Sequence, residues 1–301
     1  MTFDQTVGLW CVAAPIAVML IGTLIGRSIT RRLPAKFGQA IFGVSWFAAI
    51  AIPLFGRQGF EWWPEDAWRQ TLWMILAWAM ILPATAVQRA TKPDQPLGEL
   101  PKFGERPASA AWRWVVAGTL SCLTGMLVMP SGDAWSDTLP LHRCWMLSVT
   151  LSCLWNSYAI DAMARRNAAR WCLLMALAGL AVPFALAAAT YGSLAEWTLS
   201  MLVATFVAVI AGSTGWFPAA WVAAFPIIAG GSIITASARF YSYQDQPLWV
   251  YGVALFAPSI LATIDCSVAS RSTKLRIAVS AIAATTMTGA CIWKVLLDDP
   301  F

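Results

Sequence analysis

Charged residues are scarce in this chain. Asp, Glu, Lys and Arg make up 12% of its 301 residues, about half of the roughly 25% that soluble domains carry. Hydrophobic residues make up 59%, and the mean hydropathy is +0.65. Since the hydrophobic residues are spread along the whole length, the composition excludes a soluble enzyme, a disordered protein and a nucleic-acid-binding protein. The lipid bilayer is the expected surrounding of the chain, and nucleic acid is not an expected partner.

Histidine is almost absent, because His142 is the only one. A haem with two axial histidines, or a metal site with several, therefore cannot be built. The seven cysteines form no CxxC pair and lie in or beside apolar runs, which is typical of packing residues. The phosphate-binding loop, the dinucleotide-binding glycine pattern, HExxH and GxSxG are missing as well. We therefore predict no catalytic, cofactor-binding or metal-binding residues, and the sequence favours a protein that is not an enzyme.

What the chain has instead is long uncharged stretches. A helix needs about 20 apolar residues to cross the hydrocarbon core of a membrane. The stretches without Asp, Glu, Lys or Arg are Gln5–Gly26, Phe37–Gly56, Gln70–Gln88, Trp114–Gly132, Cys144–Ile160, Trp171–Ala195, Trp197–Ala238, Gln246–Ile264 and Ile277–Trp293. Eight of them fit one crossing each, but the 42 residues of Trp197–Ala238 would make a helix of about 63 Å, twice the bilayer core. A turn at Ser213–Pro218 would divide this stretch, so we predict about ten transmembrane helices.

The distribution of charge supports ten crossings. With ten helices, 15 of the 20 Lys and Arg residues lie on one side of the membrane and ten of the 15 acidic residues lie on the other. Because basic loops stay in the cytoplasm, both termini are predicted to lie outside. The sequence thus indicates an all-α, polytopic integral membrane protein with a single transmembrane domain over residues 1–301, in the cytoplasmic (inner) membrane if the protein is bacterial. Residues 1–160 and 161–301 would each hold five helices, which permits two oppositely oriented halves.

Polar residues inside the spans are candidates for a solute path. They are Ser148, Ser152 and Asn156 in the fifth predicted helix, Thr235 in the eighth, and Ser280 and Thr288 in the tenth. The three in the fifth helix are four residues apart and therefore form one stripe. Such a stripe either lets helices pack closely or lines a path for a solute. Asn156 is the most distinctive polar group among these residues.

Two carboxylates, Asp161 and Asp265, end predicted helices on the cytoplasmic side. A charge near the membrane core is costly, so each is expected either to pair with a base or to belong to an inner vestibule that binds a proton or a cation. Asp161 precedes Arg165 by four residues, which places the two on one helix face. Asp265 precedes Arg271 and Lys274.

One predicted external loop is rich in tryptophan and carboxylates, with Glu61, Trp62, Trp63, Asp66 and Trp68. Tryptophan at this level is typical of an aromatic belt at the lipid headgroups. The same cluster is also a candidate outer binding surface for a sugar face, a lipid headgroup or a cation.

Two functions follow from this architecture. Ten helices, compact loops, hydroxyl stripes and prolines in several spans favour a secondary transporter or permease for a small or lipid-related solute. The alternative is a non-catalytic membrane subunit or scaffold that packs against partner membrane proteins through its Trp-rich outer face. A transporter predicts a polar or water-filled cavity that reaches the middle of the membrane and touches Asn156 or the hydroxyls of the eighth and tenth helices, and tight packing there would argue against it. A scaffold predicts a defined partner that co-purifies in mild detergent.

Overall fold

The computed structural model describes residues 3–30, 35–59, 67–85, 108–130, 139–165, 169–190, 192–214, 222–241, 246–268 and 273–297. Within these ranges the chain forms helices and turns, with no strand. The all-α class is therefore confirmed for the part of the chain that the structure describes.

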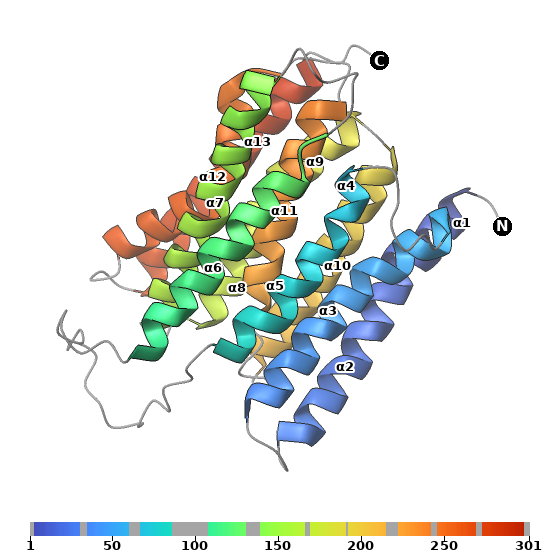
Figure 1. The fold of residues 1–301 in the computed structure, drawn as a ribbon, viewed down its shortest axis with the longest axis vertical. Helices are drawn as coiled ribbons and strands as arrows, with labels where there is room; N and C mark the ends of the chain where they lie inside the picture. The colour runs from blue at the N-terminus through green and yellow to red at the C-terminus, as the bar shows by residue number, and fades with distance from the viewer. Residues whose placement is uncertain are drawn as a thin grey trace.

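The described helices form one bundle. They are α1 (Phe3–Val7), the π-helix η1 (Gly8–Ala13), α2 (Ala14–Thr30), α3 (Ala35–Gln58), α4 (Ala67–Gln70), α5 (Leu72–Thr85), α6 (Ala108–Leu127), α7 (Leu139–Arg165), α8 (Ala169–Gly179), α9 (Ala181–Thr190), α10 (Gly192–Ser213), α11 (Ala224–Tyr241), α12 (Leu248–Ser267) and α13 (Thr273–Leu297). The start of α1 and the end of α13 lie toward the same end of the bundle (Figure 1). The long uncharged stretch Trp197–Ala238 contains two helices, α10 and α11, so its predicted division is confirmed.

Six helical stretches among the described residues are long and apolar enough to cross a membrane. They are Phe3–Thr30, Phe37–Arg57, Cys172–Thr190, Gly192–Ser213, Leu248–Asp265 and Leu275–Val295. Helices of this length and composition are those expected of an all-α membrane protein. The number of crossings and the side on which the termini lie stay predictions.

Helix α11 lies in the middle of the bundle (Figure 1). Its residues from Ala224 to Ala238 are all buried, and it packs against α5, α7, α8, α9, α10 and α12. This buried run carries no charged residue and no strongly polar face, so it is suited to an enclosed position. Small residues such as Gly230 and Gly231 let its neighbours approach closely.

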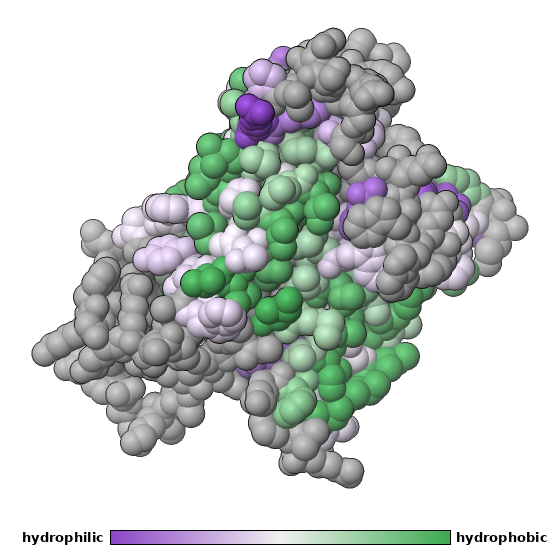
Figure 2. Space-filling model, in the orientation of Figure 1, coloured by the Kyte–Doolittle hydropathy of each residue, from purple (hydrophilic) through white to green (hydrophobic). Residues whose placement is uncertain are grey.

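Large apolar side chains cover much of the outside of the bundle. Helices α2, α6 and α7 expose them, for example Ile21, Leu24, Val115, Met126 and Leu147. Figure 2 shows hydrophobic residues across the middle of one face of the molecule and strongly hydrophilic residues nearer its margins. An apolar exterior of this extent is expected where hydrocarbon replaces water as the solvent.

Two of the core tryptophans bond a hydroxyl on a neighbouring helix. Trp46 of α3 and Trp78 of α5 are both fully buried. The indole N–H of Trp46 donates to the hydroxyl of Thr205 on α10 at 3.2 Å, and that of Trp78 donates to the hydroxyl of Thr124 on α6 at 2.9 Å. Each indole therefore fills space with its ring while its polar group bonds a neighbouring helix.

Helices α3 and α5 touch through their backbones. A Cβ atom at Gly43 of α3 would lie only 2.4 Å from the carbonyl oxygen of Ala79 on α5. In an α-helix the N–H of the residue four positions after Ala79 would donate to this carbonyl. That residue is Pro83, which has no N–H. Glycine at position 43 is therefore what lets α3 approach α5 so closely.

Candidate functional site

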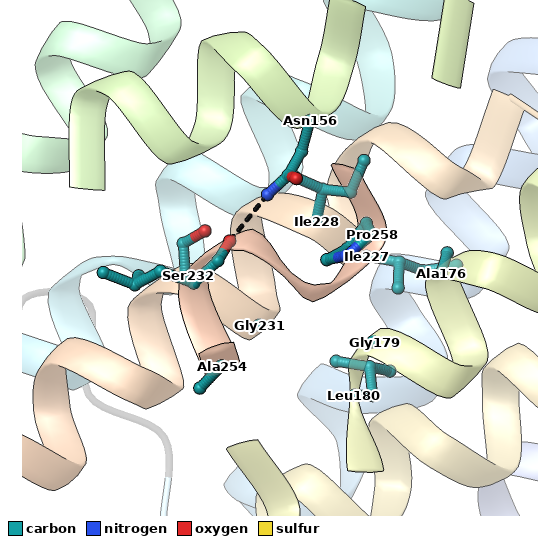
Figure 3. A pocket seen from close by; sticks show the side chains of 11 residues that line it. Asn156, Ala176, Gly179, Leu180, Ile227, Ile228, Gly231, Ser232, Ala254 and Pro258 are labelled. Atoms are coloured by element: carbon teal, nitrogen blue, oxygen red, sulfur yellow. Dashed lines mark hydrogen bonds between the residues drawn. The ribbon is translucent and has the colours of Figure 1, made fainter. Parts of the chain in front are cut away.

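Asn156, the most distinctive residue of the predicted solute path, lies on α7 and is 1% exposed. Its side chain reaches the backbone of α12 (Figure 3). The Nδ2–H group donates to the carbonyl oxygen of Leu255 at 2.8 Å. The Oδ1 atom accepts from the backbone N–H of Ser259 at 3.0 Å and also from the Ser259 hydroxyl. Both ends of the amide are therefore bonded to one neighbouring helix.

The two backbone groups that Asn156 bonds are an α-helical pair. In an unbroken helix the N–H of Ser259 donates to the carbonyl of Leu255, four residues earlier. Pro258 lies directly before Ser259, and a proline inside a helix removes a hydrogen bond and kinks the axis. Asn156 thus bonds the turn of α12 that contains Pro258.

A stretch that is divided into two helices meets α12 at this point. Helices α8 and α9 are separated by Leu180, whose N–H is shared between the carbonyls of Ala176 and Leu177 at 3.2 and 3.1 Å. A Cβ atom at Gly179, the last residue of α8, would lie 2.7 Å from Cγ of Pro258. The absence of a side chain at Gly179 therefore lets the end of α8 pack directly on the proline ring of α12.

A cavity of about 10 Å³, lined by Leu180 and Pro258 among others, lies where these helices meet. This volume is the space of about one water molecule. Its walls come from α7, α8, α11 and α12, and its lining includes Asn156 and Ser232 (Figure 3). The Ser232 hydroxyl on α11 also bonds the Ser152 hydroxyl on α7, with 3.1 Å between the two oxygens. The cavity touches Asn156 of the predicted solute path, and its volume suits a water-sized occupant.

The other candidates for the solute path lie apart from this cavity. Thr235 on α11 and Ser148 on α7 each donate to a carbonyl of their own helix, at 2.8 and 2.9 Å. On α13, Ser280 is buried and Thr288 is half-buried. None of these four residues lines the cavity.

The sequence alone does not identify the residues of α8 and α12 that form this site. The available signal is indirect, because Pro183 and Pro258 lie in uncharged stretches and each lacks a backbone N–H. Which residue of another helix meets a proline depends on how the helices are aligned, and the linear pattern does not contain that alignment. Ser259 and Gly179 become notable only once the helices are packed.

The two carboxylates of the predicted inner vestibule are both buried and paired across helices. Asp161 of α7 pairs with Arg113 of α6, and Asp265 of α12 accepts from Arg276 of α13 on both carboxylate oxygens. Asp161 is 3% exposed and Asp265 is 0% exposed.

The bases in these pairs differ from those that spacing along the chain suggests. Arg165 and Lys274 lie at helix ends whose side chains fall outside the described part of the structure, and Arg271 is itself outside it. The observed partners are Arg113 on the preceding helix, α6, and Arg276 on the following helix, α13. Arginine suits a buried carboxylate because its planar fork can donate to both oxygens at once.

A third ion pair joins α3 to α10. Arg57, in the last turn of α3, donates to both carboxylate oxygens of Glu196, near the start of α10, at 3.0 and 2.6 Å. The ring of Phe3 lies beside the guanidinium, with 5.4 Å from the ring centre to Cζ. The helix directions in Figure 1 place this pair at the opposite end of the bundle from the aspartate pairs.

The candidate outer binding surface falls largely outside the described residues. This holds for Glu61, Trp62, Trp63 and Asp66, while Trp68 belongs to the short helix α4.

His142 lies in the first turn of α7 and is buried, with its ring edge-on to Phe240 of α11 at 4.9 Å between centres. Burial lowers the pKa of its imidazole below the usual value, since the charged form would lose its hydration. Among the described residues, no group of three or more His, Cys, Asp or Glu side chains is arranged to hold a metal ion.

Comparisons with known proteins leave the geometry as the basis for a functional argument. No protein-family model, no curated protein and no solved structure matches this chain.

Proposed function

We propose that this protein is a secondary transporter for a small solute, with ten membrane crossings and both termini outside. The observation that carries the proposal is the contact between the divided stretch α8–α9 and the proline of α12, around a small cavity lined by Asn156 and Ser232 beside the central helix α11. Many transporters bind substrate and coupling ions at interrupted helices near the middle of the membrane, because backbone groups there can serve as ligands. The small cavity corresponds to a closed state of the transporter.

In this proposal Asn156 is the contact that closes α7 onto α12. Its amide bonds the carbonyl of Leu255 and the N–H of Ser259. If α12 moved away from α7, those two backbone groups could bond each other across one helical turn. In the proposed open state the helical bond between Leu255 and Ser259 would satisfy both groups without Asn156, which suits a switch between two packed states.

The ion pairs at the two ends of the bundle would act as closures. The Arg57–Glu196 pair would close the outer end, and the two aspartate pairs would close the cytoplasmic end. Opening one end while the other stays paired would expose the cavity to one side at a time. This assignment agrees with the predicted topology, which places Arg57 and Glu196 outside and Asp161 and Asp265 inside.

The test is the chemical accessibility of position 232. Ser232→Cys places a thiol at the cavity with little change in volume, in a background where the exposed Cys122 and Cys144 are alanine. The purified protein in lipid nanodiscs is treated with a water-soluble, membrane-impermeant thiol reagent. A transporter that opens to water predicts labelling of the new cysteine within minutes.

The matched control is Ser237→Cys, which also lies on α11 and is fully buried but does not line the cavity. Position 237 is expected to stay unlabelled until the protein is denatured, when both cysteines react. If position 232 is as unreactive as position 237 in the folded protein, the cavity never opens to water and the transporter proposal fails.

A scaffold or non-catalytic membrane subunit is the second candidate. The specific observation in its favour is the small cavity, together with the burial of α11 from Ala224 to Ala238. This function predicts no labelling at position 232 and a stable partner that co-purifies in mild detergent. Purification of the full chain in mild detergent, with identification of the proteins that accompany it, tests this function directly.

A further inference from the structure

The first helical run of the chain changes its hydrogen bonding partway along. Between α1 and α2, residues Gly8–Ala13 form the π-helix η1, and the N–H of Ala14 donates to the carbonyl of Leu9, five residues earlier. In an α-helix this bond would reach back only four residues. η1 is the one π-helix in the part of the chain that the structure describes. π-Helices are rare, occur mostly as single turns and are frequent at functional sites, so this turn is a candidate for a moving part.

Side chains of α1 and η1 cover the Arg57–Glu196 ion pair and its surroundings. η1 packs against α3 and α10, the two helices that this pair joins. The ring of Phe3 on α1 lies beside the guanidinium of Arg57, with 5.4 Å from the ring centre to Cζ. The ring of Trp10 on η1 lies against the preceding residue of α3, because a Cβ atom at Gly56 would be only 2.6 Å from it. The segment formed by α1 and η1 thus lies over the ion pair.

The π turn determines the direction in which α1 presents its side chains. A π-helical turn holds about one residue more than an α-helical turn, because its hydrogen bonds span five residues instead of four. One residue of an α-helix turns the chain by about 100°. Conversion of η1 to α-helix would therefore rotate α1 by about 100° relative to α2 and carry the ring of Phe3 away from Arg57. The backbone groups of the turn would exchange π-type for α-type hydrogen bonds, so the conversion leaves them bonded.

We propose that α1 is a lid over the Arg57–Glu196 pair and that η1 is its hinge. With η1 in its π form, the ring of Phe3 shields the ion pair from water, which strengthens the attraction between the two charges. With η1 in its α form, the ring leaves and water weakens the pair. The inference rests on the proposed transporter function, because that function makes this pair the closure of the outer end. The hinge would then set how readily the outer end opens.

The experiment measures distances between α1 and α12 by pulsed electron spin resonance. Spin labels are attached to Asp4→Cys and Leu248→Cys, two exposed positions. The full chain is used, with the exposed Cys122 and Cys144 replaced by alanine, and it is reconstituted in lipid nanodiscs. A lid that turns at η1 predicts two distances, one for each form of the hinge.

Substitution of Phe3 tests the contact that holds the lid closed. Phe3→Ala removes the ring from Arg57 and is expected to raise the ratio of the second distance to the first by about two- to fivefold. The control is Leu9→Ala, which truncates an exposed side chain of the same segment and is expected to leave the ratio unchanged. A single distance in both the parent protein and Phe3→Ala, or an equal response of the two variants, would overturn the lid.

Deletion of Gly8 tests the hinge. The deletion removes the extra residue of the π turn, so an α-helical connection would keep Phe3 over Arg57, and the first distance alone is expected. The control is Gly8→Ala, whose Cβ atom meets nothing within 4 Å. It keeps the length of the turn and is expected to give both distances. Two distances in the deletion variant would overturn the role of η1 as the hinge.

The cysteine labelling described above separates this inference from the proposed function. Labelling at position 232 together with a single distance in every variant would leave the transporter proposal standing and remove the lid. Two distances that respond to Phe3→Ala and to the deletion of Gly8, with position 232 unreactive, would support the hinge in a protein that does not transport.

Discussion

Substitution of Asn156 tests the contact between α7 and α12 in quantitative terms. The amide makes three hydrogen bonds to α12, and a side-chain hydrogen bond in a membrane protein contributes about 0.6 kcal/mol on average. Asn156→Leu removes all three, but Leu255 and Ser259 can then bond each other as in an ordinary helix. We therefore expect a loss of only about 1–2 kcal/mol in the free energy of unfolding.

Asn156→Asp is expected to be more damaging than Asn156→Leu, although Asp is closer to Asn in shape. A carboxylate still accepts from Ser259, but it cannot donate to the carbonyl of Leu255. It also introduces an unpaired charge at a position that is 1% exposed, which costs about 3–5 kcal/mol.

The assay is unfolding at neutral pH in mild detergent, followed by tryptophan fluorescence. Ser148→Ala serves as the control, because its hydroxyl bonds only a carbonyl of its own helix, and it is expected to change stability by less than about 0.5 kcal/mol. If Asn156→Leu destabilises the protein as much as Asn156→Asp, α12 does not re-form its backbone bond, and the exchange of hydrogen bonds proposed for opening is refuted.

Three further predictions concern the packing and charges around the bundle. Gly43→Ala is expected to destabilise the protein, because its Cβ atom would lie 2.4 Å from a backbone oxygen of α5. The control is Gly118→Ala, whose Cβ atom meets nothing within 4 Å and which should be neutral or stabilising by up to about 1 kcal/mol. Equal melting temperatures for the two variants would contradict the close approach of α3 and α5. Asp265→Asn should cost about 3–5 kcal/mol because it leaves Arg276 without its charged partner, and a change below about 1 kcal/mol in chemical unfolding would show that the pair is not buried in solution. Because burial lowers the pKa of His142, the unfolded chain takes up a proton at a higher pH than the folded chain, so stability should fall as the pH drops from about 7.5 to 5.5. His142→Phe should flatten that part of the pH profile, and an unchanged profile would assign the effect to other groups.

The overall class and the division of the longest stretch could be predicted from the sequence because both depend on local properties. Low charge and long apolar runs exclude a water-exposed fold, and both can be read from the sequence without knowing which helices are in contact. The stretch Trp197–Ala238 is too long for one crossing, and α10 indeed ends at Ser213, where the predicted turn begins. Hydropathy and length were sufficient for these conclusions.

The partners of individual side chains could not be predicted in the same way. Asp161 and Arg113 are 48 residues apart, and Asn156 meets Ser259 across 103 residues. Spacing along one helix suggests only near neighbours such as Arg165. Long-range partners depend on which helices are adjacent and how they are aligned. Both are determined by how the helices pack around α11, which the sequence pattern does not show.

The central claim is that the cavity opens to each side of the membrane in turn. The most direct measurement is the labelling of Ser232→Cys by an impermeant thiol reagent in membrane vesicles of the two opposite orientations. Alternating access predicts labelling from both faces, with Ser237→Cys unlabelled from either. Labelling from one face only, or from neither, would contradict the account.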